Sequence, residues 1–327
     1  MAISLPLILS LLAADPKLPF TSPQSDTPEY GHGLTAREAD MGWISLFDGQ
    51  TTFGWKNSKV EDGKLQGGET TTRFGKYALK AEVASGGVIR IGEGREQVDP
   101  GTFQKVVTAN KPHTIRLGAT VQVKSLCIRP LGLEPVFNGK NLEGWKVLPH
   151  PRRPKDQQTN WRVENGAIIA EGGPGALQLE GPQFRDFVMQ IKVRTREKLI
   201  NGGVFVRAIS DDFMNGYEAQ IFNACYQQDP NKPARYSTGA IDDRQLARKL
   251  VSRDEKPFVM SIIADGPHLA TWVNGVQMTD WTDDREPHEN PRQGKREKPG
   301  AIQLQAHDPQ TKVEFHQIRI RAVPQSK

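Results

Sequence analysis

Polar side chains that could do chemistry alternate along two segments in the second half of the chain. Glu218 and Gln220 share one face if their segment is an extended strand, because successive side chains of a strand point to opposite sides. Gln303, Gln305 and His307 share a face in the same way. Histidine and glutamate are common general acids and bases. Such a face is typical of a site that binds, and transfers protons on, a polyhydroxylated ligand.

Three further residues are candidates for the same site. Alternation places Arg207 on the outward face of its segment, where it would add a hydrogen-bond donor. Asp308 directly precedes a proline, where the chain can turn. Trp281 is expected in a loop beside acidic residues, where its ring could support the C–H face of a sugar. Each residue alone is more typical of a solvated surface, so the joint pattern carries the prediction.

The elements that must position these residues are short strands. Segments with alternating apolar and polar residues, bounded by Gly, Pro, Asp or Asn, predict half-buried strands. The clearest are Val188–Arg194, Val259–Ile263, Ala270–Asn274, Ile302–Ala306 and Ile318–Arg321. Many short strands with few helices indicate an all-β protein, either a β-sandwich or a jelly roll.

An internal repeat divides the chain. Leu46–Trp55 recurs as Val136–Trp145, and two later echoes keep the same order. These echoes are Val60–Leu65 with Val163–Ile168, and Gly86–Arg90 with Gly202–Arg207. The repeat predicts a reduced β-sandwich copy without a site at 41–131 and a full copy at 134–324. Trp55, Trp145, Trp161 and Trp272 are expected to be core anchors.

Composition and the chain ends limit the function classes. The chain has 327 residues, 31 Gly, 23 Pro and a net charge of +5, and no interior run is long enough for a membrane span. Its basic clusters lie in polar loops without interleaved aromatic residues, so no nucleic-acid partner is expected. The apolar run 1–14 resembles a signal peptide and 15–40 a linker, which predicts a secreted or periplasmic protein. Cys127 and Cys225 could pair, but their apolar neighbours favour buried free thiols.

Motifs of several enzyme classes are missing. The sequence has no Gly-x-Ser-x-Gly, His-Glu-x-x-His, Gly-x-Gly-x-x-Gly or P-loop motif. Gln220, rather than a carboxylate, follows Glu218 on the same face. An ordinary two-carboxylate glycosidase site is therefore not visible.

The marks of the second copy resemble the 3-keto-disaccharide hydrolase family, which has a concanavalin-like jelly-roll fold. They cover nearly all of 134–324 in the order of the family. They are Val136–Trp145, Asn201–Arg207, Gly216–Ile221, Ser237–Ile241, Trp272–Gly275 and Gly300–Asp308. One departure follows Ile241, where the family usually has an aromatic residue and this chain has Asp242 and Asp243.

The resemblance implies cleavage of glycosides that carry a ketone at carbon 3, by elimination through an enolate and addition of water. On this hypothesis Glu218 and His307 form the acid/base pair, and Arg207, Gln220, Gln305 and Trp281 contact the sugar. Asp308 would orient His307 or bind a hydroxyl.

The spacing demands no metal and no cofactor is expected, although Glu218, His307 and Asp308 are a conceivable ligand set for a divalent ion. Two alternatives remain open. One is a carbohydrate-binding module without catalysis, and the other is a structural surface protein.

Overall fold

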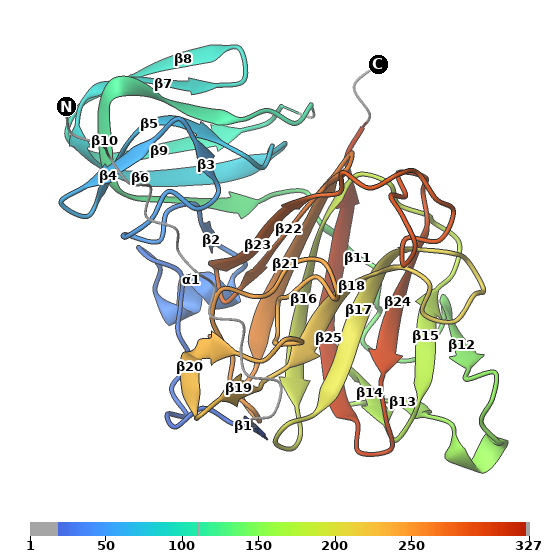
Figure 1. The fold of residues 1–327 in the computed structure, drawn as a ribbon. Coiled ribbons are helices and arrows are strands. Elements are labelled where there is room, and N and C mark those ends of the chain that lie inside the picture. The colour runs from blue at the N-terminus through green and yellow to red at the C-terminus, as the bar shows by residue number, and fades with distance from the viewer. Residues whose placement is uncertain (1–18, 110, 325–327) are drawn as a thin grey trace.

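The computed structural model describes residues 19–109 and 111–324, and nearly every element in it is a strand (Figure 1). The helical elements of the described residues are α1 (Ala36–Asp40) and one 3₁₀ turn, Lys155–Gln157. The predicted all-β class is thus confirmed. None of the helices in these residues is long and apolar enough to cross a membrane. The predicted signal peptide, residues 1–14, lies outside the described residues.

The larger domain is a sandwich of two antiparallel sheets. One sheet has the order β13-β14-β25-β16-β21-β22-β23, with β11 paired to β25, and the other has the order β12-β15-β24-β17-β18. The first contains β11 (Glu134–Pro135), β13 (Asn160–Glu164), β14 (Ala167–Glu171), β16 (Phe187–Thr195), β21 (Phe258–Asp265), β22 (His268–Val273), β23 (Val276–Thr282) and β25 (Lys312–Ala322). The second contains β12 (Trp145–Pro149), β15 (Gly175–Leu179), β17 (Asn201–Ala208), β18 (Tyr217–Phe222) and β24 (Ala301–Ala306).

Strand alternation builds the core between these sheets. On the five-stranded sheet Leu177, Leu304, Val204 and Ala219 face inward and are buried in one cluster with residues of the facing sheet. Burying each large aliphatic side chain contributes about 1.5–3 kcal/mol, so the inward face fixes the register of the sheet. The polar residues that alternate with them must therefore point to the outer face.

The smaller domain is one nine-stranded sheet. Its long strand β10 pairs in turn with β7, β5, β6 and β2, and its register with β5 shifts between Leu117 and Gln122. The sheet consists of β2 (Ile44–Ser45), β3 (Trp55–Lys56), β4 (Lys59–Glu61), β5 (Lys64–Thr70), β6 (Tyr77–Ser85), β7 (Gly87–Ile91), β8 (Gly94–Val98), β9 (Gly101–Val107) and β10 (Ile115–Pro130).

The repeat seen in the sequence has the same local structure in both copies. The indole of Trp55 donates to the carbonyl of Leu46, and the indole of Trp145 donates to the carbonyl of Val136, nine residues back in each case. The strand pairing also corresponds. The order β5-β10-β6-β9 of the smaller domain matches β14-β25-β16-β21 of the larger one. Four neighbouring strands of the smaller domain therefore correspond to four neighbouring strands of the larger domain.

The larger domain completes the core of the smaller one. Val188, Ile263, Ala270 and Trp272, from β16, β21 and β22, lie in the same hydrophobic cluster as the smaller domain's apolar residues. The Trp272 indole also donates to the Ser45 carbonyl at 3.1 Å. The two domains thus share buried surface and are packed against each other rather than tethered.

The segment expected to be a linker, 15–40, is packed along the larger domain over its described part, so that expectation is wrong there. β1 (Phe20–Thr21) pairs with β19 (Cys225–Tyr226), which also pairs with β20 (Asp229–Pro233). Further along, the Gly31 amide donates to the Asn274 carbonyl. The proline, serine and threonine content of the segment is typical of a linker, but strand pairing at Phe20–Thr21 and single backbone hydrogen bonds further along hold the segment on the larger domain.

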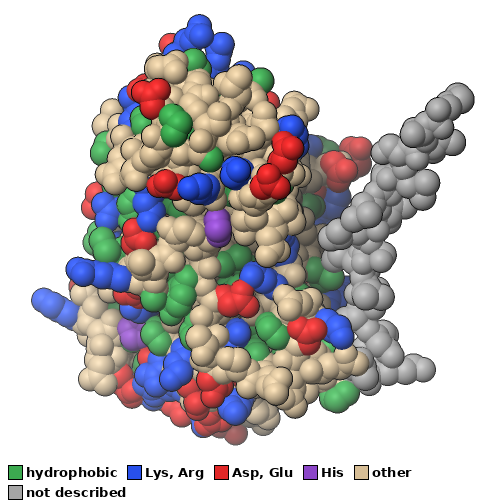
Figure 2. All heavy atoms as spheres, turned by 90° about the vertical axis from the view of Figure 1, so that its left-hand side faces the viewer, with side chains coloured by type: hydrophobic (Ala, Val, Ile, Leu, Met, Phe, Trp, Pro, Cys, Tyr) green, Lys and Arg blue, Asp and Glu red, His purple; other side chains and the backbone are tan. Residues whose placement is uncertain are grey.

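Two further features bear on the sequence predictions, the state of the two cysteines and the distribution of surface charge. Cys127 and Cys225 are both buried and free, as their apolar neighbours suggested. On the face shown in Figure 2, basic and acidic side chains are interspersed rather than gathered by sign.

Candidate functional site

The outer face of the five-stranded sheet brings together four of the predicted polar residues. The register aligns them in two rows across the sheet. One row is Gln178, Gln303, Phe205 and Glu218, and the other is Ala176, Gln305, Gly203 and Gln220. The face assignment made from strand alternation therefore holds for Glu218, Gln220, Gln303 and Gln305.

Glu218 lies in a space that Gly203 leaves open. A Cβ on Gly203 would lie 2.6 Å from Glu218 Oε1 and 3.2 Å from Gln305 Oε1. Glu218 is only 4% exposed. Burial, and secondarily the negative charge of Asp242, raise the pKa of Glu218 to about 8, although the positive charge of Arg292 opposes the shift. A carboxyl group with this pKa can exchange protons near neutral pH.

Arg292 covers this carboxyl group and is the residue that sequence reasoning missed. Its guanidinium lies 3.5 Å from Glu218 Oε2 and 2.7 Å from Asp242 Oδ2, and 5.5 Å from the ring centre of Phe205. Arg292 belongs to one of the basic clusters that the sequence places in polar loops, and nothing in the local sequence links it to β18. Asp242 is one of the two acidic residues that depart from the family pattern after Ile241.

Two buried oxygens beside Glu218 have no hydrogen-bond partner among the described residues. They are Asp242 Oδ1 and Gln305 Oε1. Buried polar atoms are normally paired, so an unpaired acceptor calls for an explanation. Both could accept hydrogen bonds from the hydroxyl groups of a ligand.

The remaining amides of the face are largely engaged in the protein itself. Gln220 donates to Asn201 Oδ1 at 2.6 Å and to the Gly202 carbonyl at 3.1 Å. Gln303 donates to the Asp212 carbonyl and accepts from the Met214 amide. Gln303 thereby holds the loop 209–216 against the sheet.

The predicted role of Arg207 in sugar binding is wrong. A register shift between β17 and β24 follows Phe205, and Arg207 has a φ of 48°, so the alternation breaks at this point. Its side chain is fully buried and donates to the carbonyls of Arg185 (2.7 Å) and Arg296 (3.2 Å). It also forms an ion pair with Asp186 at 3.3 Å. Arg207 therefore holds the loop that carries Arg292.

This loop, residues 283–299, is fixed at several points. Arg207 contacts it as described, and the Tyr217 hydroxyl donates to Asp283 Oδ2 at 2.7 Å and accepts from the Arg296 amide at 2.7 Å. Asn290 donates to Asn215 Oδ1 at 2.9 Å, which joins the loop to 209–216. The two loops are thus linked to each other by a side-chain hydrogen bond.

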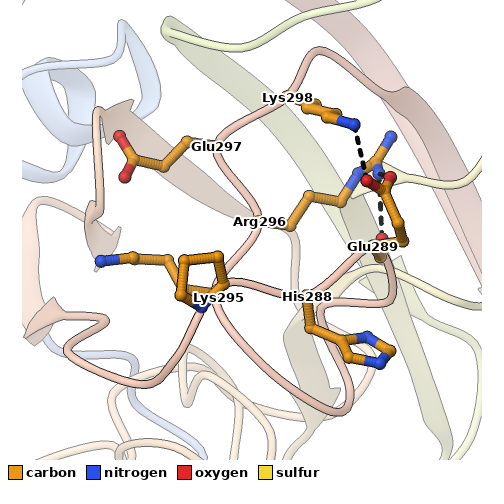
Figure 3. Close-up of a pocket in the computed structure, with 7 residues that line it drawn as sticks. His288, Glu289, Lys295, Arg296, Glu297 and Lys298 are labelled. Carbon is orange, nitrogen blue, oxygen red and sulfur yellow. Dashed lines mark hydrogen bonds and ion pairs between the residues drawn. The ribbon is translucent and has the colours of Figure 1, made fainter.

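The loop also lines a hollow of about 550 Å³ (Figure 3). Glu289 forms ion pairs with Arg296 and Lys298 there, and the lining residues do not include Glu218. Most charged side chains of this hollow form ion pairs that fix the loop, so the hollow is not the predicted sugar site.

Trp281 also differs from its prediction, because it lies in strand β23 rather than in a loop. Its ring packs edge-to-face on Tyr217, with 5.9 Å between ring centres, and against the core of the sandwich. The neighbouring acidic residues suggested a loop, but Trp281 pairs with Leu269 of β22. Because its ring packs on Tyr217 and the core, Trp281 is not the predicted platform for a sugar ring.

His307 and Asp308 follow β24 at the rim of the face. His307 is half exposed, and its Nδ1 lies 3.1 Å from Asp308 Oδ2, which fits the predicted orienting role of Asp308. No hydrogen bond joins His307 to Glu218 in the part of the chain that the structure describes. Glu218 is level with Gln303 but two strands away from it, and His307 lies four residues beyond Gln303. Spacings of about 4.8 Å between strands and 3.3 Å per residue therefore place the Cα atoms of Glu218 and His307 roughly 16 Å apart. The two side chains could flank a sugar ring but do not touch each other.

The conceivable metal set of Glu218, His307 and Asp308 is not assembled. Within residues 19–109 and 111–324, no group of three or more His, Cys, Asp and Glu side chains is placed to hold a metal ion.

Comparison with known families identifies the larger domain. A family model described as a 3-keto-alpha-glucoside-1,2-lyase-like domain matches residues 132–321. The chain belongs to this family. The predicted family is confirmed, and membership of the lyase-like family indicates a carbohydrate-related function. No curated protein matches the chain.

Several solved structures are similar to part of this chain. Two proposed glycosyl hydrolases from Parabacteroides distasonis have 17% and 21% identity, with TM-scores of 0.47 and 0.45. They match 59% and 58% of this chain and 94% and 99% of their own lengths. The carbohydrate-binding module CBM66 from Bacillus subtilis has 11% identity and a TM-score of 0.35, over 55% of this chain and 96% of its own. At these TM-scores the similarities carry no functional argument.

Proposed function

We propose that residues 132–321 cleave 3-keto-glycosides by elimination followed by hydration. The ketone at carbon 3 acidifies the hydrogen on carbon 2. A base removes this proton, the electron pair forms an enolate, and the carbon 1–oxygen bond then breaks as the aglycone leaves with a proton from an acid. Water adds back across the resulting double bond, with oxygen at carbon 1 and hydrogen at carbon 2. The net result is hydrolysis without a second carboxylate.

The observation that carries this proposal is the environment of Glu218. Its carboxyl group is buried, and its pKa is raised to about 8. A base is most effective on a weak carbon acid when its pKa lies near the working pH. Glu218 is accordingly assigned as the base that removes the carbon 2 proton.

Arg292 is assigned to the developing enolate oxygen, in place of Arg207. Its contact with Asp242 (2.7 Å) is shorter than its contact with Glu218 (3.5 Å). It can exchange the longer contact for the substrate ketone and keep the shorter one. A fixed positive charge at a developing oxyanion is an effective stabiliser in a site that excludes water. Release of Glu218 from Arg292 also increases the basicity of the carboxylate.

His307 is assigned as the acid that protonates the leaving oxygen, and Asp308 orients it. The orphaned acceptors Asp242 Oδ1 and Gln305 Oε1 are assigned to sugar hydroxyls. Gln220, whose donors are engaged, supports the face through Asn201.

The experiment uses the full chain and a p-nitrophenyl 3-keto-glucoside, with unoxidised p-nitrophenyl glucoside as the control substrate. We expect nitrophenol release from the keto substrate alone. In deuterated water the 3-keto-glucose product should carry deuterium at carbon 2, measured by NMR against a sample without protein. Direct displacement at carbon 1 would leave that hydrogen unexchanged and would contradict the elimination route.

Variants separate catalysis from simple binding. Glu218→Gln should reduce turnover by at least about 100-fold, which is typical for loss of a general base. Full activity in this variant would overturn the assignment. Binding of unoxidised saccharides without turnover of keto sugars would instead favour a carbohydrate-binding module.

A further inference from the structure

Residues of the smaller domain and the larger domain line an open cavity of about 560 Å³ that lies outside the Glu218 site. This volume falls in the range of small-molecule sites, which is about 300–1,000 Å³. The cavity is lined by three parts of the chain. These are the N-terminal segment (Tyr30), the entry turn of the smaller domain, residues 45–53 (Asp48, Gln50), and the larger domain (Asn231, Leu246, Arg248).

The entry turn of the smaller domain is fixed in place by the larger domain. Arg248 forms an ion pair with Asp48 at 2.5 Å, and its guanidinium lies 4.2 Å from the ring centre of Phe53. Gly54 approaches Gln277 so closely that a Cβ there would lie 2.4 Å from its Oε1. The wall between the domains is therefore tightly built, and the cavity is not a loose gap.

The repeat shows what is special about this turn. In the equivalent turn of the larger domain, Asn138 accepts backbone hydrogen bonds from Lys140 and Asn141, as Asp48 does from Gln50 and Thr51. Asp48 in addition makes the bond to Arg248 across the domain boundary. The smaller copy has kept the turn and uses it at the domain boundary.

The chemistry of the lining favours a neutral ligand. The lining residues Arg248, Asp48 and Lys249 form ion pairs within the protein. Arg248 pairs with Asp48, and Lys249 pairs with Glu29. The part of the lining that a ligand can contact is apolar surface with amide side chains beside it. Tyr30 and Leu246 are each 39% exposed and supply this surface.

The amides Gln50 and Asn231 are exposed beside this surface. Flat apolar surface with interspersed amides suits a sugar ring, whose C–H face packs on the former while its hydroxyls bind the latter. A charged ligand would have to break one of the ion pairs.

We propose that this cavity is a second carbohydrate-binding site, for a neutral oligosaccharide, and that the smaller domain exists to complete it. It is separate from Glu218 but not remote. The same segment runs from Asp242, beside Glu218, to Gln245, which lines the cavity. Three residues span at most about 11 Å. The site does not depend on the reaction proposed above, since an oligosaccharide needs no ketone to bind here.

The test is calorimetric titration of the full chain with cellohexaose, maltohexaose and laminarihexaose. We expect at least one of them to bind. Leu246→Ser and Tyr30→Ala should weaken that binding by at least tenfold, because each removes exposed apolar surface from the cavity. Val106→Ser is the matched control, since Val106 is 63% exposed and does not line the cavity. It should bind as the unaltered chain does.

Glu218→Gln separates this proposal from the proposed reaction. Hexasaccharide binding should survive in this variant while turnover of the keto substrate is lost. Failure of all three saccharides to bind, or binding that the cavity variants leave unchanged, would overturn the second site. Turnover of the keto substrate is measured separately from hexasaccharide binding, so the two proposals can fail independently.

Discussion

Glu218 occupies the space in which Gly203 has no side chain. The two residues lie on adjacent strands, β18 and β17, and a Cβ on Gly203 would lie 2.6 Å from Glu218 Oε1. The backbone of Gly203 needs no positive φ, so this glycine is explained by space and not by conformation. The glycine of this strand thus sets where the carboxyl group can rest.

Gly203→Ala is therefore expected to disable the site without unfolding the domain. The clashing atom is the end of a flexible side chain, so Glu218 can move aside at modest cost in stability. Turnover of the keto substrate should fall by at least about tenfold, while the thermal midpoint should change little. The two are measured by nitrophenol release and by calorimetry. A variant with normal turnover would show that the position of Glu218 is not critical.

The raised pKa of Glu218 predicts how stability depends on pH. Folding raises its pKa from the ordinary 4.5 to about 8, so between these values the folded state holds a proton that the unfolded chain releases. Stability should then fall as pH rises from 4.5 to 8, at about 1.4 kcal/mol per pH unit, and level off above 8.

Glu218→Gln mimics the protonated carboxyl group and should remove this loss. The variant should have a stability similar to that of the unaltered chain near pH 5 and be more stable than it near pH 9. Urea unfolding at the two pH values measures the difference. Equal effects of the substitution at both values would contradict the raised pKa.

Two substitutions around Glu218 should shift its titration in opposite directions. Arg292 lowers the pKa of Glu218 and Asp242 raises it. Asp242→Asn should therefore move the rising limb of the rate–pH profile to lower pH, and Arg292→Gln should move it to higher pH. Arg292→Gln should also reduce the maximal rate, because it removes the charge assigned to the enolate oxygen. Profiles that move in the same direction would sink the assignment of Glu218 as the titrating base.

The sequence allowed the strands and the repeat to be predicted because both depend on local patterns. Alternation placed Glu218, Gln220 and Gln305 on one face correctly, since each lies in a regularly paired strand. The indole bonds of Trp55 and Trp145 show that the repeated motifs are repeated structures.

The features that could not be predicted depend on contacts between distant segments. A register shift after Phe205, with a positive φ at Arg207, turns Arg207 away from the face that alternation assigns to it, because alternation assumes regular pairing. Arg292 reaches Glu218 from a loop 74 positions further along the chain (292 − 218). The shared core is similar, because only the fold shows that Trp272 packs into the smaller domain.

The buried position of Arg207 leads to the final prediction. Arg207→Ala would remove the ion-pair partner of the buried Asp186, which keeps the Gly266 amide as a donor, and would remove the side-chain donor to two backbone carbonyls. Removing one partner of a buried ion pair typically costs about 3–5 kcal/mol. Arg207→Ala should lower the free energy of unfolding by about that amount, whereas Arg292→Ala should cost less than about 1 kcal/mol, because Arg292 is partly exposed.

The contrast between the two arginines is measured by urea unfolding at one pH. Arg207→Lys keeps the charge but cannot reach all the acceptors, so it should recover only part of the lost stability. If Arg207 instead bound substrate, its loss would raise KM for the keto substrate and leave unfolding unchanged. A structural role predicts instead that the free energy of unfolding falls. Turnover then falls as a consequence, because the loop 283–299 no longer holds Arg292 over Glu218.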